Sequence, residues 1–167
     1  RGRLLKLLRE KLDQTIGPQE LETLQQRPGQ VGVAYKEIFP QNRSVLQTKF
    51  EDNEDLLNAV CHSSAFPFFS TNWPFVLDRS SRGPRLVVDG FITVDRDRFG
   101  CPDFEQADVE VDRTLMISVF PKETIGLDAS KTEDCISPET AEDGDRLDQM
   151  QRLLRLATKE SSREELS

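Results

Sequence analysis

The spacing of apolar residues predicts three helices in the first part of the chain. Residues 3–16 place apolar side chains on one helical face and most charged ones off it, the apolar face being Leu4, Leu5, Leu8, Leu12 and Ile16. Gly17-Pro18 ends this helix, and a second short helix is predicted from Pro18 to Gln25. Asp52 can cap a third helix. The apolar face of that helix consists of Leu56, Leu57, Val60, Cys61 and Ser64.

Strand-forming residues alternate with these helices. Val31–Tyr35, continuing through residues 36–39, and Ser44–Phe50 favour two strands, and the turn residues 40–42 between them predict an antiparallel hairpin. Arg85–Val88 predicts a third strand, and the near-continuous apolar run 114–120 predicts a further, buried one. The pattern therefore indicates an α/β fold, with a mixed sheet flanked by helices.

The composition changes after residue 126. Residues 127–144 are rich in Asp, Glu, Ser, Thr and Pro, which is typical of an acidic, disordered linker. Residues 145–159 regain helical periodicity, and a polar tail follows to residue 167. We therefore predict one main unit over residues 1–126, a linker over 127–144 and an amphipathic helix with its tail over 145–167.

Composition and charge narrow the classes of function. A chain of 167 residues can form one domain with a core, and the first residue, Arg1, favours a fragment or a processed piece. The net charge of -8, with no basic domain, argues against nucleic acid as a partner. Neither a signal peptide nor a transmembrane run is predicted. The three cysteines lack a C-x-x-C pair and suit reduced thiols, so we expect a cytoplasmic protein without a metal or cofactor.

Asp89 is the leading catalytic candidate. Its carboxylate follows three apolar strand formers and precedes Gly90, so it is expected at the carboxyl end of a buried strand. Chemistry in α/β proteins is commonly located there, and a glycine lets the backbone turn sharply. The alternative is that Asp89-Gly90 is an ordinary turn, for which Asp-Gly is a strong signal.

An aromatic, proline-broken segment lies between the third helix and Asp89. Its rings are those of Phe66, Phe68, Phe69, Trp73 and Phe75. The segment suits a loop that plugs the core, and the alternatives are the wall of an acyl-chain pocket or an interfacial patch. The polar loop that follows, residues 78–85, carries three arginines and is expected to be solvated, with a lipid phosphate as the alternative contact.

Two potential catalytic groups lie next to each other in the third helix. Cys61 and His62 point about 100° apart on a helix, so they cannot form a nucleophile–base pair. We expect Cys61 in the core and His62 as a satisfied or exposed helix residue. A triad through His62 would need a serine on a strained elbow, and Ser63 and Ser64 lie at the end of the helix.

The order of these motifs resembles the second half of the patatin-like phospholipase domain, and is most similar to its triglyceride-lipase and adiponutrin branch. The similarity rests on the small-residue helix, Phe66-Pro67-Phe68-Phe69 and Val88-Asp89-Gly90, and it extends over residues 1–126. The resemblance implies a partial three-layer fold and a Ser–Asp dyad in which Asp89 is the base and Gly90 supports the motif. It also implies a glycerolipid ester substrate, either triacylglycerol or phospholipid, and no metal.

The same resemblance shows departures from the family pattern. No G-x-S-x-G motif and no glycine-rich oxyanion loop occur in the chain, so the half that carries the nucleophile is absent from it. Phe91 replaces a small residue, and residues 92–104 form an insertion. Two alternatives therefore stand beside a hydrolase: a catalytically inactive lipid-binding or regulatory module, and a fragment that does not fold alone.

A lipid surface is the remaining predicted partner. The basic face of the helix over residues 3–16 could contact an anionic membrane, or the protein could lie on a lipid droplet. The simpler interpretation of that helix is a solvated face above a stripe that packs on the core.

Overall fold

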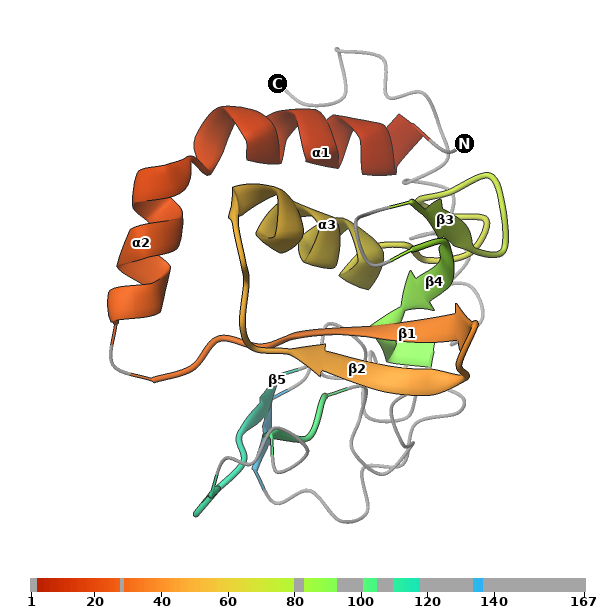
Figure 1. Ribbon diagram of the computed structural model, residues 1–167. Helices are drawn as coiled ribbons and strands as arrows, with labels where there is room; N and C mark the ends of the chain where they lie inside the picture. The colour runs from red at the N-terminus through yellow and green to blue at the C-terminus, as the bar shows by residue number, and fades with distance from the viewer. Residues whose placement is uncertain are drawn as a thin grey trace, which may run out of the picture.

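The computed structural model describes residues 3–27, 29–79, 83–92, 101–104, 110–117 and 134–136. Within them the chain forms three α-helices, a four-stranded sheet and a separate two-stranded sheet (Figure 1). The predicted class, a fold of helices on a sheet, is confirmed at this level. The predicted helix over residues 145–159 and the polar tail lie outside the described residues.

The three helices form where the apolar periodicity predicts them. They are α1 (Arg3–Thr15), α2 (Pro18–Gln26) and α3 (Asn53–Ser63). Asp52 caps α3, because its Oδ1 accepts a hydrogen bond of 2.7 Å from the Asp55 N–H. No residue of α1 is fully buried, and Leu4 is exposed. Fewer than the five predicted residues of its apolar face therefore pack against the rest of the protein.

The larger sheet has the strand order β2-β1-β4-β3. Its strands are β1 (Val33–Phe39), β2 (Arg43–Gln47), β3 (Val76–Asp78) and β4 (Arg85–Asp89). The predicted β1–β2 hairpin is confirmed. Every pairing in this sheet is antiparallel, so the expectation of a mixed sheet is wrong for it. The reason is that β4 enters through a second hairpin, from β3, and no helical crossover links neighbouring strands.

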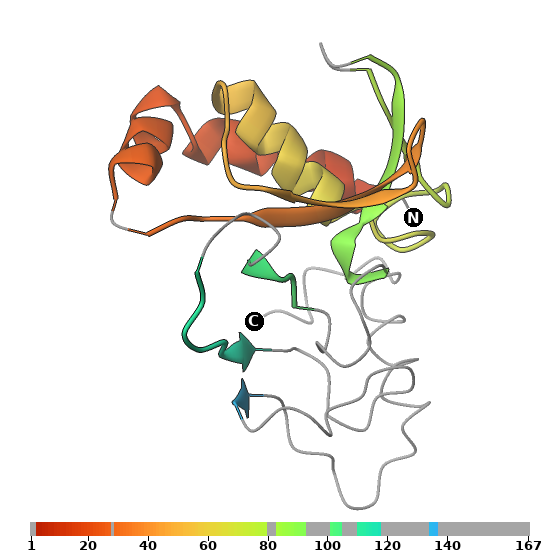
Figure 2. The same ribbon diagram turned by 60° about the horizontal axis from the view of Figure 1, so that its bottom comes forward.

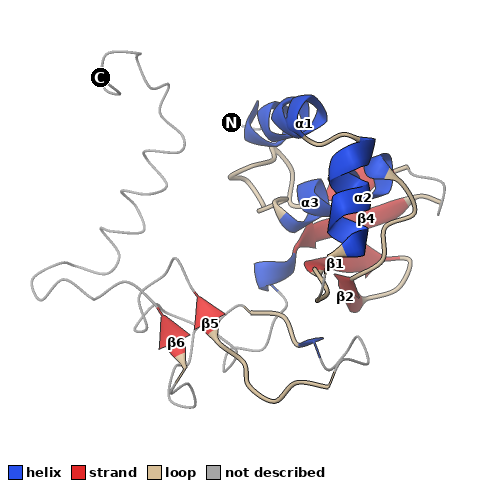
Figure 3. Cartoon of the chain, turned by 90° about the vertical axis from the view of Figure 1, so that its left-hand side faces the viewer, coloured by secondary structure: helices blue, strands red, loops and turns tan. Residues whose placement is uncertain are grey.

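The helices gather on one side of the sheet (Figure 2). Helix α3 packs on β1 and β4, and α1 packs on α3 (Figure 3). Arg9 joins the two helices, since its Nη1 donates a 2.7 Å hydrogen bond to Asn58 Oδ1 and its Nη2 pairs with Glu54. Residues from the helices and from strands that are far apart in the sequence thereby pack together.

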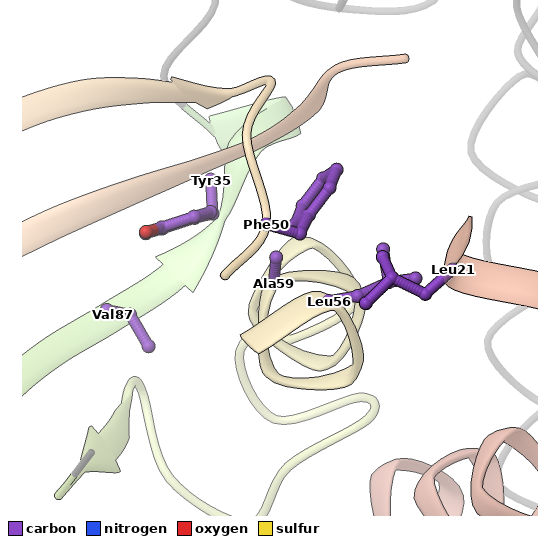
Figure 4. Close-up of a cluster of buried hydrophobic side chains, with 6 residues drawn as sticks. All are labelled: Leu21, Tyr35, Phe50, Leu56, Ala59 and Val87. Atoms are coloured by element: carbon purple, nitrogen blue, oxygen red, sulfur yellow. The ribbon is translucent and has the colours of Figure 1, made fainter. Parts of the chain in front are cut away.

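That core lies between α3 and the sheet. Its buried apolar side chains come from α2, α3, β1, β4 and the segment before α3 (Figure 4): Leu21, Tyr35, Phe50, Leu56, Ala59 and Val87. Burying each large apolar side chain contributes roughly 1.5–3 kcal/mol. The predicted core position of Cys61 is confirmed, because this residue of α3 is buried.

Two predictions for the later part of the chain fail in the described residues. The predicted buried strand 114–120 is described only up to residue 117, where β5 (Met116–Ile117) forms, and Leu115 and Ile117 are exposed rather than buried among the described residues. Within the predicted linker, residues Cys135–Ile136 form β6, which pairs in parallel with β5. The linker is therefore not structureless at these positions.

Candidate active-site cavity at the end of β4

Asp89 ends the inner strand β4, beside the carboxyl end of α3. Its backbone N–H donates to the Ala65 carbonyl at 3.1 Å, which ties the strand end to the segment just after the helix. Its Oδ1 accepts a 2.8 Å hydrogen bond from the Phe91 N–H. The rest of the half-buried carboxylate faces a cavity of about 420 Å³. The cavity is lined by Gly32, Val33, Ala34, Val60, Ser63, Ser64, Asp89, Gly90, Phe91 and Pro102.

Burial raises the pKa of the Asp89 carboxyl above its ordinary value, and the hydrogen bond from the Phe91 N–H opposes that rise. Among the described residues, Asp89 forms no ion pair that would offset the cost of burying its charge. A carboxylate with a raised pKa is a stronger base than an exposed one. The environment therefore suits a group that accepts a proton at neutral pH.

Gly90 is required by close approach of the neighbouring strand. A Cβ added there would lie 2.5 Å from the Ala34 carbonyl oxygen and 2.7 Å from the Ala34 carbonyl carbon. Its φ is not in the left-handed region, and a 3-10 turn (Gly90–Ile92) begins at it. The sharp change of direction that the Asp-Gly pair predicts is present, but backbone contact with β1 is what excludes a side chain.

The structure does not bring the five predicted aromatic residues into this cavity. Phe66 comes nearest, since its ring lies 6.4 Å from that of Phe91, which does line the cavity. Phe69 packs edge-on against Phe66 at 6.1 Å, and Phe75 is half-buried. Phe68 and Trp73 are exposed. Phe66, Phe69 and Phe75 are thus half-buried, and none of the five belongs to the core cluster described above.

Two hydroxyl groups share the cavity with Asp89. Ser63 is the last residue of α3 and Ser64 is its C-cap, and both line the cavity. The carboxyl end of a helix carries partial negative charge, which opposes a developing oxyanion. These serines are therefore better suited to hydrogen-bond a substrate or Asp89 than to act as nucleophiles. Their proximity to Asp89 depends on the tertiary pairing of α3 with β4, for which the sequence has no local signal.

A second polar cluster lies on the same side of the sheet, at the other end of β4. Arg85 pairs with Asp78, lies 3.7 Å from Glu37 and donates a 3.4 Å hydrogen bond to the Tyr35 hydroxyl. All four side chains are buried. The prediction of a solvated loop over residues 78–85 is therefore wrong at both of its ends, because the β3–β4 hairpin sets Asp78 directly opposite Arg85. The sequence did contain a signal for this pairing, because the opposite charges of Asp78 and Arg85 stand at the facing ends of two apolar runs.

His62 belongs to this second cluster. It is buried, its ring lies 5.2 Å from that of Tyr35, and its Nε2 is 3.8 Å from Asp78 Oδ2. Burial lowers the pKa of His62 to about 4, with Asp78 opposing this and Arg85 adding to it. His62 is thus a buried residue that is neutral at pH 7, so the prediction of a satisfied or exposed helix residue is wrong in the part that leaves it exposed. Burial likewise raises the pKa of the Cys61 thiol, opposed by Arg9, so Cys61 stays protonated.

Neither metal ligands nor a membrane-spanning helix are found in the described part of the chain. No three His, Cys, Asp or Glu side chains there are grouped to hold a metal ion. No helix in the same residues is both long and apolar enough to cross a bilayer.

Comparison with known proteins leaves the family open. No family model matches the chain, and no curated protein or solved structure matches it significantly. The resemblance to the patatin-like domain therefore stays a prediction that rests on the residues quoted for it.

Proposed function

We propose that this chain supplies the general base of a lipid acyl hydrolase, with Asp89 as that base. The observation that carries the proposal is a half-buried carboxylate, without an ion pair among the described residues, that faces a cavity of about 420 Å³. Catalytic bases are commonly held in such clefts with a shifted pKa. The substrate class, an ester of a glycerolipid, comes from the resemblance to patatin-like enzymes.

In the proposed mechanism Asp89 takes the proton of a serine hydroxyl as that oxygen attacks the ester carbonyl. The ester C–O bond then breaks, an acyl-serine forms, and the proton passes from Asp89 to the leaving alcohol. In the second step Asp89 takes a proton from the water that attacks the acyl-serine. The bond between the acyl carbon and the serine oxygen breaks, the proton passes to that oxygen, and the fatty acid leaves. This chain contains no G-x-S-x-G motif, so we do not expect it to supply the nucleophilic serine from such a motif.

The test is the rate of ester hydrolysis by the native protein and its Asp89→Asn variant. General base catalysis contributes roughly 10²–10⁴-fold, so we expect kcat to fall by that factor with the fold retained. Asp112→Asn, at an exposed carboxylate, is the matched control and should keep full activity. Full activity in Asp89→Asn would remove Asp89 from the mechanism.

A Ser63→Ala/Ser64→Ala double variant tests the source of the nucleophile. Substantial remaining activity is expected, because these hydroxyls lie at the unfavourable end of α3. Complete loss, together with loss of labelling by a fluorophosphonate, would assign the nucleophile to this cavity.

The second candidate is a catalytically inactive lipid-binding module, and the missing G-x-S-x-G motif favours it. It predicts that the folded native protein hydrolyses neither triacylglycerol nor phospholipid yet binds lipid. The Asp89→Asn substitution would then leave lipid binding unchanged.

A further inference from the structure

The aromatic segment exposes its apolar residues and buries its polar ones. Phe68 is 60% exposed and Trp73 is 70% exposed, whereas Ser70 and Thr71 are only 3% and 6% exposed. Side chains in contact with water usually show the opposite distribution. This inversion indicates a segment built to present rings to something other than water.

Hydrogen bonds hold the segment in this arrangement. The Ser70 N–H donates to the Phe66 carbonyl at 3.1 Å, and the Ser70 hydroxyl donates to the Ser64 carbonyl. Phe68 has a φ of 59°, a left-handed conformation that is rare for a bulky residue and strains the backbone. The backbone is therefore fixed in a strained form in which the Phe68 ring projects outward.

The beginning of α1 adds exposed leucines at the same end of the molecule. The Leu5 N–H donates to the Ser70 carbonyl at 3.3 Å, so the first turn of α1 lies against the aromatic segment (Figures 1 and 3). Leu4 and Leu7, three residues apart and thus neighbours on the helix surface, are 47% and 55% exposed. We call Leu4, Leu7, Phe68 and Trp73 the apolar patch.

The charges nearest the apolar patch are mainly cationic, although the whole protein is acidic. The nearest acidic side chain along the sequence is that of the exposed Glu10, whose Oε1 lies 3.7 Å from Lys6 Nζ. Residues 66–77 contain no charged residue, and residues 1–9 contain four basic residues and no acidic one, in a chain with a net charge of -8. Arg9 faces α3, whereas Arg3 and Lys6 are exposed. Rings and leucines bordered by basic side chains suit the boundary between lipid headgroups and acyl chains.

We propose that the apolar patch, together with Arg3 and Lys6, binds the surface of an anionic phospholipid membrane. Trp73 and Phe68 enter the headgroup–acyl boundary, and the two basic side chains meet lipid phosphates and carboxylates. The charge pattern favours this occupant over a second copy of the same acidic chain. The inference does not rest on hydrolysis, since none of these residues faces the Asp89 cavity.

Trp73 is the single tryptophan of the chain, so its fluorescence reports on this site alone. The experiment titrates the protein with vesicles of phosphatidylcholine, with and without phosphatidylserine. We expect a blue shift and quenching by brominated lipid with the anionic vesicles, and a weaker response at high salt. Asp89→Asn should bind as the native protein does, which separates failure of this proposal from failure of the proposed function.

Matched variants sharpen the test. Phe68→Ala/Leu7→Ala, which keeps the tryptophan, should lose vesicle sedimentation, whereas Ile117→Ser, at an exposed apolar residue of β5, should not. Lys6→Gln should weaken binding about fivefold, the effect of one basic side chain near an anionic surface, and Lys49→Gln should not. Equal binding to neutral vesicles would overturn the proposal. So would an unshifted Trp73, or a Trp73 shift that follows protein concentration without lipid and thus marks a protein–protein contact.

Discussion

Arg85 and Asp89 are charged residues four positions apart on one face of β4, and they have opposite surroundings. Arg85 is buried against Asp78, Glu37 and Tyr35, so its charge is compensated on several sides. Among the described residues, the Asp89 carboxylate accepts one hydrogen bond, from the Phe91 N–H, and it faces a cavity. The comparison teaches that burial of a charge does not identify function. A charge enclosed by partners stabilises the fold, whereas a charge left uncompensated beside a cavity is available for chemistry.

Removing Arg85 tests the structural half of this comparison and should have the largest effect. Arg85→Met leaves the buried carboxylates of Asp78 and Glu37 without their shared cation. The free energy of unfolding should fall by about 3–5 kcal/mol, measured by chemical denaturation. Arg43→Met is the control, because Arg43 is exposed and also pairs with Glu37, and it should cost less than about 1 kcal/mol. Similar losses in both variants would show that the buried cluster around Arg85 contributes no more to stability than an exposed ion pair does.

His62 makes the same cluster sensitive to pH. Its pKa is about 4 in the folded state and near 6.5 in the unfolded state, so between these values the unfolded state binds more protons. The contribution of His62 to stability is therefore full above pH 6.5 and falls as the pH drops towards 4, by about 3 kcal/mol in all. Unfolding measured at pH 7 and pH 4.5 should show this loss in the native protein and a smaller one in His62→Gln. Parallel pH profiles would count against a buried, neutral His62.

Gly90 tests how the Asp89 end of β4 is positioned. The Cβ of Gly90→Ala would press on the backbone of Ala34, which cannot rotate away, so we expect a loss of about 1–3 kcal/mol. Gly17→Ala is the matched control, because its Cβ would meet only the flexible end of Glu20, at 3.1 Å. Thermal unfolding of the two variants gives the difference. Equal melting temperatures would mean that β1 and β4 can separate at this point.

Asp89→Asn should have the smallest effect on stability and the opposite sign. Burial raises the pKa of Asp89, so at pH 7 its charge opposes folding, and asparagine can still accept the Phe91 hydrogen bond. The melting temperature should rise at pH 7, and the rise should shrink as the pH falls towards the pKa of Asp89. Lower stability at pH 7 would place Asp89 among the structural charges, with Arg85.

Local patterns predicted most of the elements, because each pattern was complete within its own segment. Examples are the Asp52 cap and the β1–β2 hairpin. The antiparallel sheet was missed because β3 follows the proline-broken aromatic segment, where no strand was predicted, and because β1, the other neighbour of β4, is distant in the sequence. The buried Asp78–Arg85 pair was missed because charged residues near a glycine and a proline suggest a solvated loop. Asp89 itself was predictable, but its cavity and its serine neighbours follow only from the packing of α3.

The pairing of β1 with β4 also sets an order for folding. The β1–β2 hairpin closes locally, in about 1–10 μs for a typical hairpin. The bond between Arg85 and Tyr35, by contrast, joins residues 50 positions apart. Contacts of such long range must wait for the intervening chain to be made and brought back, and they slow folding. We therefore expect the side of the hairpin that receives β4, with the Glu37 carboxylate on it, to stay hydrated until β4 docks. The docking of one five-residue strand then completes the sheet, the charged cluster and the cavity in the same step.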